Sequence, residues 1–332
     1  MKRRHADASG RPRPAQAGAA LLTAMLTVAL VATLAAGALW QQWRSVEVEA
    51  AERARAQSLW VLAGALDWAR LILREDARSG VVDHLAEPWA VPLEEARLST
   101  FLATDAGNPG QETDPGADQA FLSGLIMDLQ ARMNVAGLLD NGKVSETGLK
   151  AFARLFQTLG LPPAELTAMA ENLRLAKAAS TGGEDIATAP LMPERVEQLV
   201  WLGLSPRSLE VLRPHITLLP VSTPVNLNTA SATVLFACIP SLDMAQAQQL
   251  VNARKASHFR SLPDATAKLG PMKEPLNAAW HSVSSQFFEI RGRLRLEQTV
   301  VEERSVVRRD GLEVKTLWRE RGTPEPQTKT LQ

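Results

Sequence analysis

A run of 22 residues without a charged side chain, Ala19 to Trp40, constrains this chain more than any other feature. As an α-helix the run would be about 33 Å long, which is enough to cross the hydrocarbon core of a bilayer, about 30 Å thick. The chain is therefore expected to have one membrane-spanning helix near its N-terminus.

The residues before this run are basic. Residues 1–18 carry five Lys and Arg side chains and one acid, and the prolines at positions 12 and 14 disfavour a helix there. Because Lys and Arg collect on the cytoplasmic side of a membrane, we expect the N-terminus inside and the main part of the chain outside. Trp40 and Trp43 stand where an aromatic belt would meet the outer interface.

Three interpretations of this segment compete. It could be an ordinary signal anchor. It could be a secretory signal peptide cut near residues 35–37, although the apolar core of such peptides is usually only about 7–15 residues long. It could also be a leader that is cut on the cytoplasmic side, after Gly18, so that the apolar segment is kept as the start of a long helix.

The composition argues against nucleic-acid binding and against catalysis. Cutting after Gly18 would leave 31 basic and 35 acidic residues, a formal charge of −4, which does not favour an anionic partner. The five histidines lack metal-ligand spacing, and the sequence contains no Gly-x-Ser-x-Gly motif and no Gly-rich phosphate loop. Cys238 lies in an apolar run and is expected to be a buried structural thiol. We therefore expect no enzyme.

Periodicity predicts an α+β fold. Apolar residues three and four apart between 59 and 73 extend the first helix to about Ser79, with Gly80 ending it. Residues 81–118 are expected to be a loop, and residues 120–130 contain a short strand. The segment from about 138 to 275 is predicted to be helical, with helices at 145–159, 163–178, 193–202, 205–213, 229–238 and 243–255. Alternation from 288 to 297 and runs at 299–308 and 312–319 predict antiparallel strands, with a hairpin at Asp310-Gly311.

Two short segments resemble one family. The stretch from Gln16 to Thr23, with Gly18 followed by Ala19, is similar to the prepilin peptidase site of type IV pilins and type II secretion pseudopilins. Most members have Glu where this chain has Thr23, and a small apolar pair, Leu-Leu and no Glu is the pattern of the minor pseudopilin K family. Asp128, Gln130, Arg132 and Asn134 match the family's D-x-Q-x-R-x-N-x-N segment, whose last Asn is Ala136 in this chain.

The resemblance implies a pilin-like α+β domain, a long helix on an antiparallel sheet, into which a large all-helical domain is inserted. The helical domain would be SAM-like, or helix-hairpin-helix-like. The implied parts are listed here in chain order: a leader at 1–18, a transmembrane helix at 19–40, a pilin-like domain at 41–135 and 281–322, the inserted helical domain at 136–280, and a disordered tail at 323–332.

The absent carboxylate also has an implied meaning. In assembling pilins the Glu meets the α-amino group of the subunit ahead. A carboxylate inside a bilayer costs about 2.5–3.5 kcal/mol unless it is paired. A subunit with none ahead gains nothing from it, and Thr23 can hydrogen-bond to its own helix instead. The resemblance thus implies a subunit at the tip.

The segment from Pro224 to Leu235, which contains Asn226-Leu-Asn-Thr-Ala230, leads into a helix-hairpin-helix pattern. Asn228 or Thr229 is expected to cap the helix that follows. The segment is shared by the K family's inserted domain and by a membrane-anchored competence DNA receptor. The receptor needs a Gly-rich hairpin whose amides bind phosphate, whereas this chain has Pro240 and Asp243 there. The DNA receptor is kept as the alternative function.

The family's inserted domain binds calcium, which takes about 6–8 oxygen ligands. Only Gly182-Gly-Glu184-Asp185 matches that region, so Glu184 and Asp185 are the candidate calcium ligands. Arg174 and Lys177 stand nearby and oppose a cation. Asp140-Asn-Gly-Lys143 resembles the start of a calcium loop, but its residues favour a plain turn.

The resemblance implies a bacterial inner-membrane protein of type II secretion, with a cytoplasmic N-terminus and periplasmic domains. Its expected partners are prepilin peptidase, the minor pseudopilins I and J, and a secreted substrate or the secretin channel. No nucleic acid and no certain cofactor are expected.

Overall fold

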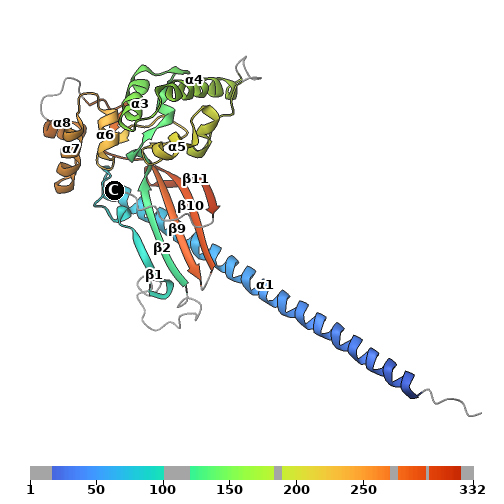
Figure 1. Ribbon diagram of the computed structural model, residues 1–332. Helices are drawn as coiled ribbons and strands as arrows, with labels where there is room; N and C mark the ends of the chain where they lie inside the picture. The colour runs from blue at the N-terminus through green and yellow to red at the C-terminus, as the bar shows by residue number, and fades with distance from the viewer. Residues whose placement is uncertain (1–16, 101–119, 183–188, 270–275, 297–298, 323–332) are drawn as a thin grey trace, which may run out of the picture. The chain divides into compact units, whose positions relative to one another are not determined.

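The computed structural model describes residues 17–100, 120–182, 189–269, 276–296 and 299–322 (Figure 1). The chain forms two compact units, residues 1–57 and residues 58–332, which are described one at a time. The helix α1 (Ala17–Ser79) contributes residues to both units.

In the first unit the described residues form one uninterrupted stretch of α1. It contains an 18-residue window of mean hydropathy 2.2, none of which is buried, so by length and composition it could cross a membrane. The hydroxyls of Thr23, Thr27 and Thr33 donate to carbonyls three or four residues earlier. These bonds satisfy the polar groups inside the helix, as an apolar environment requires.

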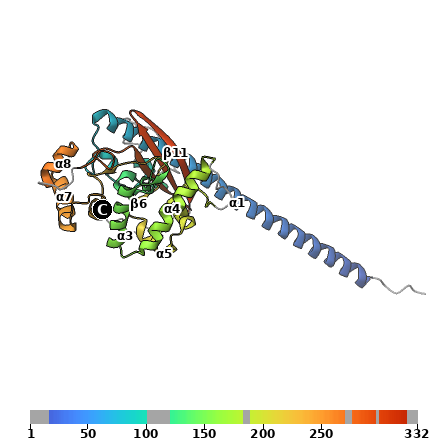
Figure 2. The same ribbon diagram turned by 90° about the horizontal axis from the view of Figure 1, so that it is seen from above.

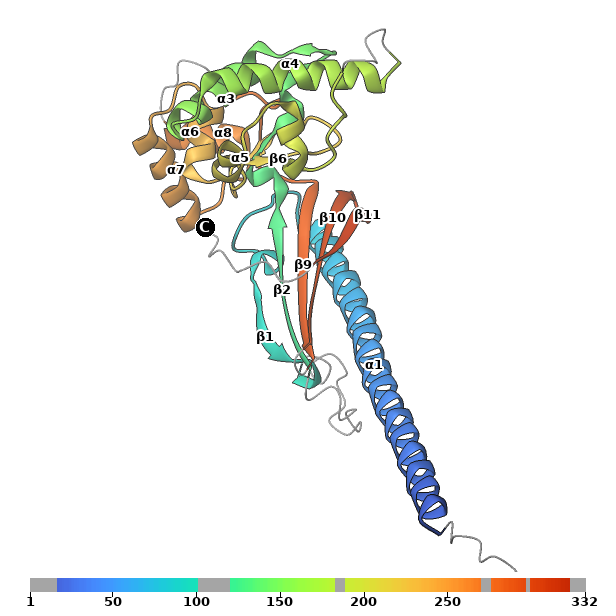
Figure 3. The same cartoon turned by 45° about the vertical axis from the view of Figure 1, so that its right-hand side comes forward.

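The second unit contains a five-stranded antiparallel sheet in the order β1-β2-β9-β10-β11 (Figures 1 and 3). Its strands β2 and β9 pair although 158 residues separate Asp128 from Phe287. The strands are β1 (Leu93–Arg97), β2 (Ala120–Asp128), β9 (Phe287–Leu296), β10 (Thr299–Asp310) and β11 (Glu313–Gly322).

Residues 58–79 of α1 cover one face of this sheet. Leu62, Leu66 and Leu73 are buried on the inner side of the helix and pack against apolar strand residues such as Phe288. The helix approaches closely at Gly292, where an added Cβ would lie 3.1 Å from Leu62 Cδ2. The three- and four-residue spacing of the leucines therefore marked the buried stripe correctly.

The helical part of the second unit lies between β2 and β9 in the chain and has its own apolar core (Figures 1 and 2). Phe152, Leu155, Met169 and Leu235 are among its fully buried residues. Its α-helices are α3 (Glu146–Thr158), α4 (Pro163–Ser180), α5 (Pro206–Leu212), α6 (Ala232–Cys238), α7 (Met244–Ala256) and α8 (Leu262–Leu269).

The second unit also contains short elements. They are the 3-10 helices η1 (Pro88–Ala90), η2 (Leu129–Ala131), η3 (Val135–Leu138) and η4 (Val196–Leu202), and the two-residue strands β3 (Met133–Asn134), β4 (Leu139–Asp140), β5 (Lys143–Val144), β6 (Ile216–Thr217), β7 (Val225–Asn226) and β8 (His281–Ser282). The parallel pairs β3-β6 and β7-β8 join segments far apart in sequence.

The α+β fold class is confirmed, and three local predictions need correction. Residues 93–97 were expected to be loop but form β1, whose partner strand a local pattern does not reveal. The segment 196–202 is a 3-10 helix rather than an α-helix. Neither Asn228 nor Thr229 caps α6; Ser231 does, and its side chain accepts from the amide of Val234.

The two expected turns are present. Asn141 and Gly142 both have positive φ, 48° and 77°, between the paired strands β4 and β5. Gly311, with φ 57°, turns the chain between β10 and β11. The leader before residue 17 and the tail from 323 lie outside the described residues, and the boundaries of the inserted domain stay predictions.

Candidate functional site

The predicted cleavage site lies at the start of α1. Gly18 and Ala19 belong to its first turn. The Thr23 hydroxyl lies 3.1 Å from the carbonyl oxygen of Ala19 and 3.0 Å from that of Ala20. The side chain that stands in place of a carboxylate is therefore satisfied within its own helix.

The two family-like segments meet at one buried carboxylate, Asp128. Its Oδ2 accepts hydrogen bonds from Thr229 Oγ1 at 2.5 Å, Ser285 Oγ at 2.6 Å and Asn226 Nδ2 at 3.1 Å, and its Oδ1 accepts from the amide of Gln130 at 2.7 Å. Asp128 ends β2, while Asn226 and Thr229 precede α6. The contact therefore joins the sheet to the helical part.

The next two motif residues extend this junction. Gln130 Nε2 donates to the carbonyl of Pro224 at 3.0 Å. Asn134 Nδ2 donates to the carbonyl of Val221 at 2.7 Å, and its Oδ1 accepts from the amide of Leu219 at 3.2 Å. Gln130 and Asn134 therefore bind the chain segment that leads into β7.

The Asn-Leu-Asn segment is held from its other side as well. Asn228 exchanges two hydrogen bonds with the backbone of Phe259, at 2.9 and 2.8 Å. Arg254 of α7 donates to the carbonyl of Leu227 at 2.7 Å. Burial lowers the pKa of Arg254 to about 10. Asn228, predicted as a possible helix cap, acts instead as a bridge between separate loops.

A second buried cluster lies beside this junction, and the sequence did not point to it. Arg309 of β10 donates to Asp83 and, at 2.7 Å, to Asp76 Oδ2, and at 3.0 Å to the carbonyl of Ser285. Asp83 Oδ2 also accepts from the amide of Ser285 at 2.7 Å. Arg309 lies between Arg308 and Asp310, among other charged residues, so its buried role left no separate signal.

Burial sets the acid–base behaviour of these groups. It raises the pKa of Asp83 to about 7, although the Arg309 guanidinium acts in the opposite direction. Burial also raises the pKa of Asp128, against its hydrogen bonds from Ser285 and Thr229. The Cys238 thiol is buried, and its pKa rises to about 12, which fits the predicted structural role.

Two basic residues precede the predicted calcium ligands in the chain. Arg174 binds Glu171 at 2.5 Å, and Lys177 lies in the last turn of the same helix. These cations oppose a bound metal ion. Glu184 and Asp185 lie outside the described residues.

One further group of acids lies close together. The carboxylates of Asp76, Asp83 and Glu87 have oxygens within 4.8 Å of one another. Arg309 pairs with the first two, and the indole N–H of Trp89 donates to Glu87 Oε2 at 2.7 Å. Because the Arg309 guanidinium already pairs with two of the three carboxylates, we interpret the group as a structural ion-pair cluster.

The hairpin before α7 does not suit a phosphate. Asp243 is the N-cap of α7, and its carboxylate accepts from the amide of Gln246 at 2.7 Å. A negative side chain therefore occupies the position that a phosphate would take at this helix N-terminus.

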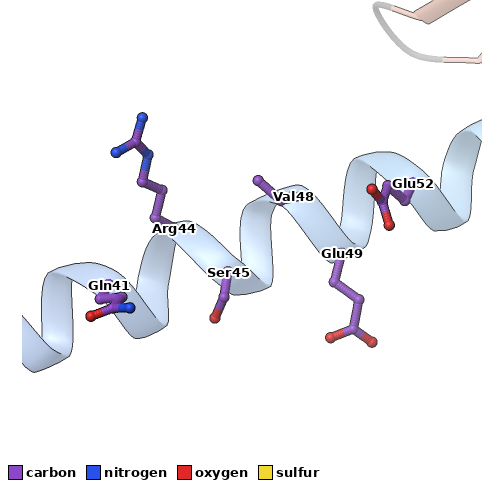
Figure 4. Close-up of a pocket in the computed structure, with 6 residues that line it drawn as sticks. All are labelled: Gln41, Arg44, Ser45, Val48, Glu49 and Glu52. Atoms are coloured by element: carbon purple, nitrogen blue, oxygen red, sulfur yellow. The ribbon is translucent and has the colours of Figure 1, made fainter.

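Figure 4 shows one further surface stretch, on the part of α1 that belongs to the first unit. Its residues are Gln41, Arg44, Ser45, Val48, Glu49 and Glu52. They all come from this helix alone, so they form an open surface rather than an enclosed site. Neither this stretch nor the buried clusters has the arrangement of nucleophile, base and oxyanion donors that catalysis would need.

The comparisons with known proteins agree on one family. Two family models, both described as type II secretion system protein K, match residues 131–221 and 225–284. The type II secretion system protein K of Pseudomonas aeruginosa is 29% identical over 299 residues, covering 84% of each chain. That of Pectobacterium carotovorum is 25% identical over 343 residues, covering 93% of this chain and 98% of the relative.

The fold has a match among solved structures. A chain in the crystal structure of the GspK-GspI-GspJ complex from the type 2 secretion system of enterotoxigenic Escherichia coli aligns with a TM-score of 0.62. The match covers 82% of this chain and 99% of the other, at 18% sequence identity. The likeness shows that the two chains share a fold.

Proposed function

The chain belongs to the protein K family of type II secretion systems and is a minor pseudopilin, and on this premise we propose that it stands at the tip of the pseudopilus. There it assembles with the minor pseudopilins I and J, initiates the pseudopilus and supports export of folded proteins across the outer membrane. The solved neighbour, which comes from a complex of GspK with GspI and GspJ, supports this choice of partners.

The observation that carries the tip position is Thr23. Its hydroxyl is satisfied by carbonyls of its own helix, so this position holds no charge that needs a neighbour within the apolar segment. A subunit inside the filament would need a carboxylate for the amino group of the next subunit. A subunit with none ahead is stable without one.

A second support is the outward side of α1 in the second unit. Trp60 is 80% exposed, and Gly64 and Leu71 lie on the same side of the helix, opposite the leucines that pack on the sheet. Nothing lies within 4 Å of a Cβ added at Gly64, so another helix can approach there. We assign this side to packing against a helix of I or J.

The processing step tests membership of the assembly pathway. We propose that prepilin peptidase cuts between Gly18 and Ala19, which leaves α1 anchored in the inner membrane and the second unit in the periplasm. N-terminal sequencing of the protein extracted from membranes should start at Ala19. Gly18→Leu should remain uncut, whereas Gly37→Leu, a matched change further along the same helix, should be cut normally. An intact Met1 or a start near Leu39 in the unaltered chain would refute the proposal.

The partner proposal has its own test. The tagged chain, co-expressed with I and J, should recover both proteins from detergent-solubilised membranes. Trp60→Glu should reduce their recovery several-fold, because it places a charge in an apolar helix contact. Trp201→Glu alters another exposed tryptophan (46% exposed), in the helical part, and should leave recovery unchanged. Equal recovery with both variants would contradict the assignment of α1.

Two smaller proposals accompany this one. The helical part contacts secreted substrate or the secretin, and Glu184 with Asp185 contributes to a calcium site. Isothermal titration of the purified protein with CaCl₂ tests the second proposal. If calcium gives no binding heat and no change in melting temperature, the calcium site is rejected. The absence of a mobility shift with duplex DNA would support the exclusion of the DNA receptor.

A further inference from the structure

Three arginines gather on the face of the sheet that α1 does not cover. Arg291 of β9 and Arg304 of β10 are direct cross-strand partners, and side chains on this face point away from Ile290 and Val307, which pack on α1. Arg132 follows η2, just before β3. Burial lowers the pKa of Arg132 and the Glu289 carboxylate raises it, while the positive charges of Arg291 and Arg304 lower it further, so its charge acts on those of the other two.

The glutamate carboxylates nearby are already paired with arginines. Glu289 lies 2.5 Å from Arg291 Nε. Glu320 binds Arg195 at 2.7 Å and Arg304 at 3.2 Å. Like charges directly opposite on neighbouring strands destabilise a sheet, so these carboxylates explain how the Arg291–Arg304 pair is tolerated.

Further out, Glu197 binds Arg213 at 2.6 Å and lies 4.0 Å from Arg304. Among the described residues, the cluster therefore holds five guanidinium groups against four carboxylates, counting Asp128, an excess of one positive charge. The whole chain has equal numbers of basic and acidic residues, so the excess is local.

Arg132 has no directly bonded acid, although the charges of Glu289 and Asp128 act on it. Among the residues that the structure describes, its guanidinium makes no hydrogen bond and no ion pair, although burial is the main cause that lowers its pKa. The neighbouring His215 adds a second unsatisfied group, because its Nδ1 is buried without a partner. A partly buried cation and a buried ring nitrogen are costly to leave unpaired.

We propose that Arg132, with Arg291 and Arg304, forms a binding site for a carboxylate carried by an acidic segment of a partner protein. A guanidinium fork matches a carboxylate, and an acidic side chain there would offset the excess charge. The neighbouring strand residues Leu125 and Met127, opposite Arg291 and Glu289 on β2, are partly exposed and give the segment an apolar edge to rest on. This site is separate from the α1 surface and does not depend on the tip position.

A peptide-binding assay tests the site with the full chain in detergent micelles. The probe is a fluorescein-labelled hexaglutamate peptide, followed by fluorescence anisotropy. The unaltered chain should bind it saturably. Arg132→Gln should weaken binding at least about tenfold, as loss of a charge-assisted contact predicts. Arg295→Gln removes an arginine from the same strand face, one bound to Glu95 at 2.7 Å, and should change the affinity by less than about twofold.

Three results would overturn the proposal: no binding by the unaltered chain, equal losses in both variants, or tighter binding of inorganic phosphate than of the peptide. A stability measurement separates binding from a structural role. Without peptide, Arg132→Gln should melt at or above the temperature of the unaltered chain, because it removes an unpaired cation beside two others. A lower melting temperature would show that Arg132 supports the fold and would also count against the site.

Discussion

Replacement of Asp128 by alanine should destabilise the junction between the sheet and the helical part. The substitution removes the acceptor of four buried hydrogen bonds, from Gln130, Asn226, Thr229 and Ser285. Asn226 keeps two other acceptors, the carbonyl of Asp83 and the Ser285 hydroxyl. The Gln130 amide loses its acceptor, and the Thr229 hydroxyl keeps only a long contact with the carbonyl of Asn226.

The expected cost follows from these contacts. Hydrogen bonds to a charged group contribute about 1.5–3 kcal/mol each, and an orphaned buried donor costs about 1–3 kcal/mol. Removal of the buried charge offsets part of this loss of stability, because burial disfavours the charged carboxylate, as its raised pKa indicates. We therefore expect Asp128→Ala to lower the free energy of unfolding by about 3–5 kcal/mol. At about 2–4 °C per kcal/mol, the melting temperature should fall by about 6–20 °C.

The assay is urea and thermal unfolding of the full chain in detergent, followed by tryptophan fluorescence. Asp140→Ala removes an exposed aspartate from the β4-β5 turn and should change stability by less than about 0.5 kcal/mol. Asp128→Asn keeps the shape and one acceptor oxygen, so its loss should be intermediate. A loss below about 1 kcal/mol for Asp128→Ala would refute the view that this carboxylate holds the junction together.

Three further outcomes are expected from the same unfolding measurements. Arg309→Ala leaves two buried carboxylates facing each other and should cost about 3–5 kcal/mol; a loss near zero would show that the cluster is hydrated. His84 and His258 stack with ring centroids 3.9 Å apart, and burial lowers the pKa of both. The folded state then binds fewer protons than the unfolded state, so their contribution to stability is lost as the pH falls below about 6.5; His258→Phe, which keeps the stacking, should reduce this acid loss between pH 7.5 and 5. Gly148→Ala places a Cβ 2.3 Å from a backbone oxygen and should cost about 1–3 kcal/mol, whereas Gly64→Ala meets nothing within 4 Å and should stabilise α1 by up to about 1 kcal/mol; the opposite order would contradict the packing.

Local patterns predicted most of the secondary structure. Helices α3, α4 and α7 and strands β9, β10 and β11 lie within a few residues of their expected ranges, because amphipathic spacing and turn residues act over short distances. The β1 strand was missed because its five residues carry no strong alternation and are defined by pairing with β2. The cap of α6 was misplaced because Asn228 and Thr229, both with good capping chemistry, precede Ser231.

The candidate site could be predicted only in part. Asp128, Asn226 and Thr229 were each singled out by family-like segments, but nothing in those segments showed that they meet. Arg309 lies beside other charged residues in β10, so the sequence does not reveal its burial, which depends on the acid placed opposite by α1. Glu184 and Asp185 lie outside the described residues, and their role stays a prediction.

The sequence alone determined the properties that depend on neighbours along the chain. The length of the uncharged run, the basic residues before it and the leucine stripe after it were sufficient to predict α1 as an anchor and a sheet-packing helix. The tertiary structure alone decided which distant groups share a buried space. Asp128 receives hydrogen bonds from residues 98, 101 and 157 positions away, and Arg132 stands beside two arginines from distant strands. Such contacts arise from chain crossings, for which no local pattern exists.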